Sequence, residues 1–211
     1  MNQKLVDKVK NRIDSYIKFG SDDLFKNGDL KIFGGAVRDS IADMPIHDVD
    51  IICGAVTSKR IHSFLESKGF TYMKDLTPKD LSRVYSDLKC INEPWTYVKN
   101  DIIIQVIRPT GNNNMTPKDT KRHIDYLIEN VDISCCGVSY DGQSIKEAHE
   151  NSIIHCLCKI CCTNPSAIMS HPNRLLLRKH KLMDRGWEFF VTHEEEHQLI
   201  RERNIGKLLN N

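Results

Sequence analysis

Two aspartates follow a pair of glycines in the segment KIFGGAVRDSIADMPIHDVDII, residues 31–52. Asp48 and Asp50 lie two residues apart in an apolar run, and residues at this spacing in a β-strand point to the same face. Two carboxylates held side by side repel each other unless a cation lies between them. Oxygen ligands that leave room for substrate phosphates suit Mg²⁺ or Mn²⁺. The pair therefore predicts a divalent-metal site with Asp48 and Asp50 as ligands.

The glycines form the second part of the pattern. Gly34 and Gly35 follow the strand-like stretch LKIF and precede a short helical stretch, AVRDSIAD. Glycine at such a turn lets the backbone approach a ligand closely, and the following helix offers N–H groups to an anion. Arg38, one turn into that helix, is placed to grip a phosphate. Each feature alone has a structural explanation, such as a plain turn or an Arg38–Asp39 ion pair. Together they favour phosphoryl or nucleotidyl transfer.

The whole segment GGAVRDSIADMPIHDVDI resembles the head-domain signature of class II CCA-adding enzymes and bacterial-type poly(A) polymerases, in the polymerase β-like nucleotidyltransferase superfamily. The signature is GGxVRD, a short spacer and DxD. The resemblance implies a head that binds an NTP with Mg²⁺ and extends an RNA 3′ end without a template. By that resemblance, Asp48 and Asp50 are the catalytic acids that hold the metal. Gly35 and Arg38 contact the nucleotide phosphates, and Gly34 belongs to the same nucleotide-binding turn.

A second, weaker likeness lies in NVDISCCGVSYDG, which is similar to the RRDFTINAxAYD segment of this family. It places Asp132 where an aspartate helps to hold the nucleotide ribose. Asn130 and Val131 stand in place of the two arginines, so any contact that those arginines make is lost or supplied elsewhere.

A third likeness lies in HPNRLLLRKHKLMDRGWEF, which resembles the neck segment DPxRxLRxxRFxxRLGF. Arg174 matches, Leu177 takes the next arginine position, and Arg178 approximates it, so we expect both arginines to bind nucleotide. Basic residues recur on one face of this predicted helix, and we call them the basic stripe: Arg174, Arg178, Lys181 and Arg185. Our hypothesis is that the stripe meets the triphosphate or the RNA backbone, and the alternative is a solvated face.

The resemblance covers roughly residues 30–190 and has one clear departure. The stretch IIIQVIR looks like a family strand that carries an acidic residue, and Gln105 stands where that acid would be. We also expect no room for the body and tail domains that position tRNA, nor for the segment that selects CTP or ATP. Complete CCA synthesis by this chain alone is therefore not expected.

The predicted fold class is α+β, with a mixed-sheet nucleotidyltransferase head flanked by helices and followed by a short helical neck. We expect an amphipathic N-terminal helix over residues 1–24, the head over 25–165 and the neck-like extension over 166–211. Within these units, we expect strands at 30–35, 48–56 and 70–75, a hairpin over 94–109 that turns at Asn100-Asp101, helices at 58–70 and 120–130, a strand or buried run at 152–162, and helical structure from 172 onward.

Two other groups of metal-ligating residue types have ordinary explanations. The string HEEEH, His193 to His197, fits the HExxH zinc-protease pattern but lies in an acidic stretch, which favours a solvated helix. The cysteines of HCLCKICC, Cys156 to Cys162, favour core packing over metal binding because they lack the spacing of a zinc site. We expect Cys135, Cys136 and Cys53 in the core as well.

The composition of the chain restricts the cellular compartments and the binding partners that we expect for it. The net charge of +2 is too small to indicate nucleic-acid binding by itself, so any basic surface must be local. No apolar run is long enough to span a membrane, and the N-terminus does not look like a signal peptide. Eight cysteines without a secretion signal favour reduced thiols and a cytoplasmic setting. A homo-oligomer, or a partner subunit that supplies an RNA-binding surface, is compatible with this chain.

Three functions remain open on sequence grounds. The first is template-independent transfer of NMP from an NTP to an RNA 3′ end. The second is the same transfer to a protein or a small molecule. The third is a non-catalytic head subunit that holds nucleotide or RNA, which Gln105 favours and the intact pair of aspartates opposes.

Overall fold

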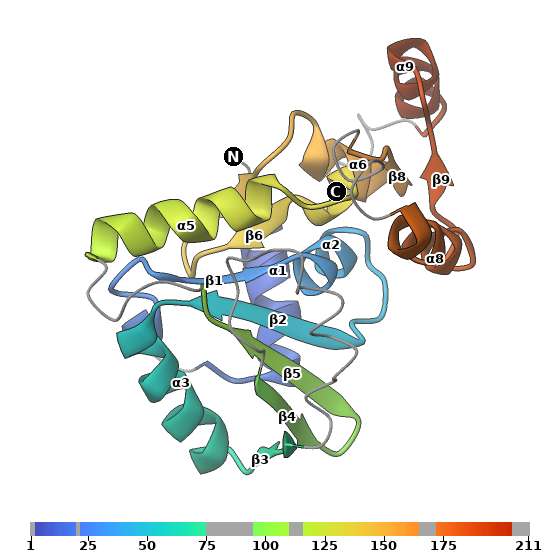
Figure 1. Cartoon of the computed structure of the whole chain (residues 1–211). Helices are drawn as coiled ribbons and strands as arrows, with labels where there is room; N and C mark the ends of the chain where they lie inside the picture. Colours follow the sequence, from blue (N-terminus) through green and yellow to red (C-terminus); the bar gives the residue numbers. More distant parts are fainter. Residues whose placement is uncertain (1–2, 20–21, 75–94, 110–115, 165–171, 204–211) are drawn as a thin grey trace.

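The structure is a computed structural model that describes residues 3–19, 22–74, 95–109, 116–164 and 172–203. At its centre lies a seven-stranded sheet with the order β3-β4-β5-β2-β1-β6-β7 (Figure 1). The strands are β1 (Leu30–Phe33), β2 (Asp48–Cys53), β3 (Thr71–Tyr72), β4 (Trp95–Lys99), β5 (Ile102–Ile107), β6 (Val138–Tyr140) and β7 (Ile145–Glu147). Because β2 runs antiparallel to β1 and parallel to β5, the sheet is mixed. The predicted α+β class is confirmed.

Helices lie on both faces of this sheet, and α8 (Pro172–Met183) and α9 (His193–Glu202) lie beyond one end of it (Figure 1). The other helices that the structure describes are α1 (Gln3–Tyr16), α2 (Gly35–Ile41), α3 (Ala55–Ser67), α5 (Pro117–Glu129) and α6 (Ser152–Cys158). Val49 and Ile51 of β2 are fully buried in the core that α1, α2 and α3 share. Ile52 points to the opposite face, where Ile124 of α5 packs near it. α5 covers one end of that face.

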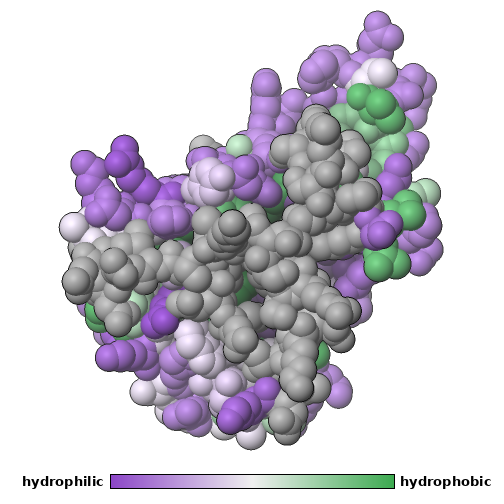
Figure 2. All heavy atoms as spheres, viewed as in Figure 1, coloured by the Kyte–Doolittle hydropathy of each residue, from purple (hydrophilic) through white to green (hydrophobic). Residues whose placement is uncertain are grey.

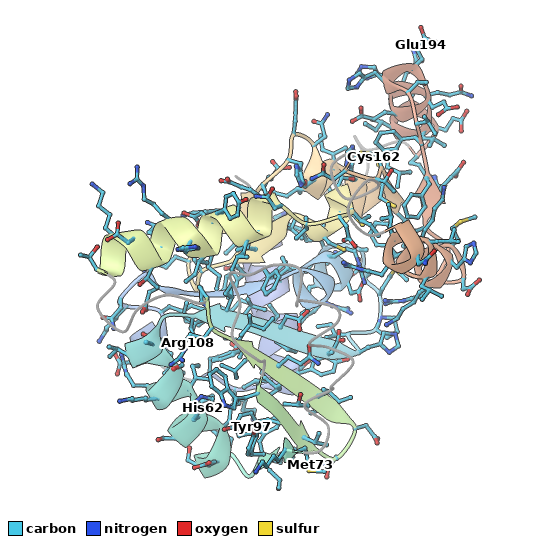
Figure 3. All side chains as sticks on the ribbon, in the orientation of Figure 1. His62, Met73, Tyr97, Arg108, Cys162 and Glu194 are labelled. Carbon is cyan, nitrogen blue, oxygen red and sulfur yellow. The ribbon has the colours of Figure 1, made fainter. Side chains whose placement is uncertain are left out.

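Helices α1 and α3 are fixed by different contacts. The apolar side of α1, with Val6, Val9 and Ile13, is buried in the main core, as its periodicity predicts. In α3, the Nδ1 atom of His62 lies 2.8 Å from the hydroxyl of Tyr97 on β4 (Figure 3). This bond ties α3 to the outer part of the sheet.

The prediction of a strand or buried run at residues 152–162 is confirmed as to burial, but a strand is wrong for most of the stretch. Most of this stretch forms α6, and only the two residues Ile160–Cys161 form a strand, β8. Lys159 ends the helix in the left-handed region, with a φ of 54°. The run is short and apolar, and for such runs periodicity does not separate a buried helix from a strand. The hairpin prediction is confirmed, because β4 and β5 pair as antiparallel neighbours on either side of Asn100-Asp101.

The cysteines that the structure describes are buried, as predicted, with one exception. The buried ones are Cys53, Cys135, Cys136, Cys156, Cys158 and Cys161, and Cys162 is half-buried. The HEEEH segment forms the start of α9 and is mostly exposed. Glu196 is the exception, since only 4% of it is exposed, so the prediction of a solvated helix is wrong at this position.

The C-terminal part of the described chain carries an apolar surface. Leu175 and Leu182 of α8 are buried, but other apolar side chains of this part are exposed: Leu176, Leu177, Met183 and Val191. Figure 2 shows hydrophobic atoms gathered on this side of the molecule. β9 (Glu188–Phe189) follows α8 and pairs with β8 in a parallel two-stranded sheet. The division at residues 24 and 165, and the expected oligomer or partner subunit, stay predictions.

Among the described residues, no helix combines the length and the apolar character that crossing a membrane requires.

Candidate active site

The two aspartates of β2 lie side by side, as the spacing predicts. Along β2 the burial alternates: Asp48 and Asp50 are half-buried, whereas Val49 between them is fully buried on the other face. Asp50 pairs in register with Phe33 of β1 on one side and with Gln105 of β5 on the other. The aspartates therefore sit in the middle of the sheet, on the face that α5 covers only in part.

Asp50 is a half-buried acid whose Oδ1 atom is itself buried and receives no hydrogen bond in the described structure. Burial, followed by the nearby charge of Asp48, raises the pKa of Asp50 to about 8, against the opposing effect of Arg178 and Arg38. A buried polar atom without a partner is uncommon in folded proteins, and strongly raised acids gather at functional sites. The geometry thus points to a group that arrives from outside the chain.

The Gly34-Gly35 turn closes over this pair of acids. Gly34 has a φ of +65°, and a Cβ atom on it would lie 3.9 Å from Oδ2 of Asp50. A Cβ atom on Gly35 would lie 3.5 Å from Oδ1 of Asp48 and 3.7 Å from Nη2 of Arg38. Side chains here would narrow the space in front of the acids, and Gly34 also needs the left-handed conformation that glycine adopts freely.

Arg38 reaches this space from a rigid position. Its Nε and Nη2 donate to Oδ1 and Oδ2 of Asp39 at 2.8 and 3.0 Å, and its Nη1 donates to Sγ of Cys136 at 3.2 Å. Its guanidinium lies 5.3 Å from the ring centroid of Trp187. The Arg38–Asp39 ion pair therefore does form, and Nη2 still lies beside Gly35. The two explanations offered by the sequence are compatible.

Asp132 and Arg178 join the same region. Nη1 of Arg178 donates to Oδ1 of Asp132, and its Nη2 donates to Sγ of Cys136 at 3.5 Å. Cys136 thus receives hydrogen bonds from both Arg38 and Arg178. The structure brings Arg38 and Arg178 together around one sulfur atom, and Asp132 joins them through Arg178. The side chain of Arg174 lies outside the described part, so its role stays a prediction.

Two contributors were not assigned to the site from sequence, Asp39 and Trp187, and a third, Arg185, was placed there only as a member of the basic stripe. Nη2 of Arg185 donates to Oδ2 of Asp39 at 2.8 Å and to the carbonyl of Pro45 at 3.2 Å. Arg185 belongs to the basic stripe, but it faces a buried acid, whereas Lys181 is exposed. The spacing of four, three and four residues therefore does not define one uniform surface. No local signal in the sequence joins Arg185 to Asp39.

The acids fit a magnesium ion that takes its remaining ligands from elsewhere. Among the described residues no group of three or more His, Cys, Asp or Glu could hold a metal ion, so Asp48 and Asp50 are a pair. Mg²⁺ commonly binds through one or two carboxylates together with water and substrate phosphates. The unpartnered Oδ1 of Asp50 suits that arrangement, and Gly35 adds no side chain beside Oδ1 of Asp48. Gln105, on the neighbouring strand, supplies an amide instead of a third acid.

No protein-family model matches this sequence, and no curated protein matches it. Solved structures do match. The Thermotoga maritima CCA-adding enzyme complexed with tRNA aligns over 95% of this chain and 44% of its own, with a TM-score of 0.57 and 14% identity. A CCA-adding enzyme in an apo form aligns over 98% of this chain and 46% of its own, with a TM-score of 0.61 and 14% identity.

A tRNA nucleotidyltransferase complexed with a primer tRNA and an incoming ATP analog aligns over 89% of this chain and 51% of its own, with a TM-score of 0.52 and 14% identity. At these identities the likeness concerns the fold. The described chain has the fold of the corresponding part of these nucleotidyltransferases, which confirms the predicted head-domain fold. It spans a little under half the length of the two CCA-adding enzymes.

Proposed function

We propose that this chain, which shares its fold with CCA-adding enzymes, is a template-independent nucleotidyltransferase that moves NMP from an NTP to an RNA 3′ end. In this reaction the terminal hydroxyl oxygen bonds to the α-phosphorus, and the bond to pyrophosphate breaks. The observation that carries the proposal is the pair Asp48 and Asp50, with the unpartnered Oδ1 of Asp50 under the Gly34-Gly35 turn. The fold neighbours, one with tRNA and one with a primer tRNA and an ATP analog, support RNA as acceptor.

Each residue has a distinct task in this proposal. Asp48 and Asp50 hold Mg²⁺ or Mn²⁺, which when bound would activate the attacking hydroxyl and neutralise charge on the leaving pyrophosphate. Gly34 and Gly35 leave room for the triphosphate. Arg38, held by Asp39 and by the ring of Trp187, binds phosphate oxygens.

Three further residues, Asp132, Arg178 and Arg174, complete the nucleotide site that we propose. Asp132 accepts hydrogen bonds from the ribose, and Arg178, its neighbour, binds nucleotide beside it. Arg174 acts from the same helix as Arg178. We propose a cytoplasmic setting for this activity, on the basis of the cysteine content alone.

One observation favours a second candidate, a non-catalytic head that binds nucleotide or RNA. Gln105 lies next to Asp50 in the sheet, so the pair of acids has no third carboxylate on this neighbour. Such a head would bind an NTP with a divalent ion but would not release pyrophosphate. Transfer to a protein or a small molecule remains a third outcome, in which pyrophosphate is released without extension of RNA.

The test offers each of the four NTPs in turn, with Mg²⁺ or Mn²⁺ and a generic single-stranded RNA, and follows primer extension on a gel and pyrophosphate release in solution. We expect extension with at least one NTP, and its loss in Asp48→Asn and Asp50→Asn. Asp7→Asn, a change of an exposed acid on α1, is the matched control and keeps activity. Binding of NTP without pyrophosphate release would replace the transferase by the non-catalytic head.

A further inference from the structure

Cys136 lies between two arginines of the proposed nucleotide site and has no part in the reaction described above. Its Sγ atom accepts a hydrogen bond from Nη1 of Arg38 at 3.2 Å and one from Nη2 of Arg178 at 3.5 Å. Arg38 belongs to α2 and is 98 residues away in the sequence, whereas Arg178 belongs to α8 and is 42 residues away. Only 1% of Cys136 is exposed. One buried sulfur atom therefore joins two helices that supply cations to the same site.

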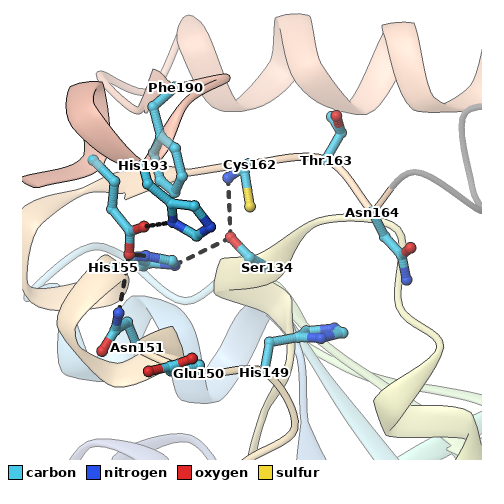
Figure 4. A pocket seen from close by; sticks show the side chains of 11 residues that line it. Ser134, His149, Glu150, Asn151, His155, Cys162, Thr163, Asn164, Phe190 and His193 are labelled. Atoms are coloured by element: carbon cyan, nitrogen blue, oxygen red, sulfur yellow. Dashed lines mark hydrogen bonds and ion pairs between the residues drawn. The ribbon is translucent and has the colours of Figure 1, made fainter.

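The backbone that carries Cys136 is fixed by the segments around it. Cys136 is the last residue of the short helix η3 (Ser134–Cys136). The N–H of Ser134 donates to the carbonyl of Cys162 at 2.9 Å, and the N–H of Cys162 donates to Oγ of Ser134 at 3.0 Å (Figure 4). The same Oγ atom lies 3.2 Å from Nδ1 of His155 on α6 (Figure 4). The sulfur atom of Cys136 therefore has a defined position from which to hold the two arginine side chains.

The two guanidiniums repel each other across this sulfur atom. Both carry a positive charge, and like charges in partly buried surroundings repel more strongly than they do in water. Each is also bound on its other side by an acid. Arg38 donates to Asp39, and Arg178 donates to Asp132. An atom that accepts hydrogen bonds from both cations offsets the repulsion and sets one separation between them.

The thiol of Cys136 holds the arginines without cancelling their charge. A hydrogen bond with Cys135, followed by burial, raises the pKa of Cys136 against the effect of the two arginines, so the sulfur atom is uncharged near pH 7. A thiol is a weak acceptor, whereas a carboxylate at this position would form ion pairs with both cations. Burial and the charge of Asp48 raise the pKa of Asp50, and the charges of both arginines oppose that rise. The positive charge therefore remains available to phosphate oxygens next to the acids.

We propose that Cys136 is a positioning residue of the nucleotide site, whose sulfur atom holds Arg38 and Arg178 at the separation that a bound NTP requires. The inference rests on the proposed function, because that function assigns both arginines to an NTP. Arg38 lies beside Gly35, on the side assigned to the phosphates. Arg178 lies beside Asp132, on the side assigned to the ribose. Without the sulfur atom the NTP itself has to bring the two guanidiniums together, so the loss appears in affinity and in KM and much less in kcat.

The test is calorimetric titration of the full chain with a non-hydrolysable analog of each NTP in turn and Mg²⁺, so that no transfer takes place. Cys136→Ala removes the shared acceptor and should weaken binding roughly tenfold, the effect of losing hydrogen bonds from charged donors to one weak acceptor. Cys136→Val fills the space of the thiol with apolar groups and should weaken binding at least as much, which covers the case in which the alanine variant does not fold.

Two further variants separate the acceptor from the packing. Cys136→Ser keeps an acceptor at nearly the same place and should bind within about threefold of the unchanged chain. Cys53→Ala removes another buried thiol, on β2 in the main core, and is the matched control. It should bind the analog as the unchanged chain does. In primer extension, Cys136→Ala should raise KM for NTP roughly tenfold and leave kcat within about threefold.

A purely structural role of Cys136 predicts a different result. Cys136→Ala and Cys53→Ala would then both lower the free energy of unfolding but bind the analog equally well, and equal binding overturns the inference. Binding by Cys136→Ser that is as weak as binding by Cys136→Ala also overturns it, because the acceptor would then have no effect. Pyrophosphate release tests the proposed function separately. Analog binding without release of pyrophosphate from NTP contradicts the transferase and leaves the comparison of the Cys136 variants valid, whereas no analog binding by the unchanged chain overturns both.

Discussion

Asp50 and Glu196 are both carboxylates in buried surroundings, but they differ in hydrogen bonding and in the direction in which their pKa is shifted. Oδ1 of Asp50 has no partner, and burial together with Asp48 raises the pKa of Asp50 to about 8. Burial by itself would also raise the pKa of Glu196, but hydrogen bonds from His155, His193 and Asn151 lower it below its ordinary value. Asp50 therefore costs stability in its charged form, whereas Glu196 contributes stability in that form.

This difference in hydrogen bonding distinguishes a candidate site residue, Asp50, from a structural residue, Glu196. The donors around Glu196 come from α6, from the residue before it, and from α9 itself, so the carboxylate joins α9 to the rest of the chain. A carboxylate that folding leaves without a donor is retained for another reason, and a cation or a substrate group is the simplest. Burial of an acid alone is thus not the mark of a functional site, and the missing partner is the informative feature.

The largest expected effect is on transfer. Asp50→Asn and Asp48→Asn each remove a charged ligand, and loss of metal stabilisation worth several kcal/mol lowers kcat by at least about 100-fold. Glu196→Gln keeps part of the hydrogen bonding around this side chain. Its kcat should stay within about threefold of the value for the unchanged chain once the protein is folded. Primer-extension rates at saturating NTP measure both. Equal losses of kcat in Asp50→Asn and Glu196→Gln would mean that Asp50 is not the functional acid and Glu196 the structural one.

The second prediction concerns stability against pH. The folded pKa of Asp50, about 8, lies above its value of 3.8 in the unfolded chain, so the folded state binds more protons between these values. The free energy of unfolding therefore falls as the pH rises from about 4 to about 8, and Asp50→Asn removes this loss. Denaturant unfolding at pH 5 and pH 8, without divalent ions, should show a smaller pH-dependent loss in Asp50→Asn than in the unchanged chain. If the free energies of unfolding of Asp50→Asn and of the unchanged chain changed equally with pH, Asp50 would not be an acid that folding leaves without a donor.

Glu196→Gln should destabilise the fold by about 1–3 kcal/mol, because it weakens hydrogen bonds to a buried charged acceptor. Glu194→Gln, on the exposed start of the same helix (Figure 3), is the matched control and should change the stability by less than about 0.5 kcal/mol. Since the folded pKa of Glu196 is lowered, its contribution is present above the unfolded value of 4.5 and is lost as the pH falls through the folded pKa. Chemical denaturation at pH 7 and below pH 4 measures this contribution, and an equal difference between the two variants at both pH values would be evidence against it.

The smallest effect is expected at Arg185, which acts through Asp39 and Arg38. Arg185→Ala leaves Asp39 with one cationic partner fewer, so Arg38 is held less firmly. We expect a rise of roughly fivefold in KM for NTP, about 1 kcal/mol, with kcat little changed. Arg185→Lys should restore part of this loss, and His180→Ala, exposed on α8 just before Arg185, should have no effect.

Calorimetric binding of a non-hydrolysable NTP analog checks the Arg185 prediction without catalysis. An analog that binds Arg185→Ala and the unchanged chain equally well would mean that Arg185 supports the fold alone.

Much of the site follows from the sequence because its residues are local. The alternation of Asp48, Val49 and Asp50 sets the direction of each side chain, and Gly34-Gly35 can bend in only a few ways. The register that places Asp50 beside Phe33 and Gln105 depends on other strands and is seen only in the fold. The helix at Ser152–Cys158 was missed because a short apolar run has no distinctive period.

The sequence alone determined which groups are able to bind a metal and a phosphate, since that depends on residue type and on spacing within one turn or one strand. Tertiary structure decided which of the buried acids has a partner. Arg185 meets Asp39 from 146 residues away, and His155 meets Glu196 from 41. Such pairs form because packing of separate elements brings them into contact, and no periodicity along the chain records that packing.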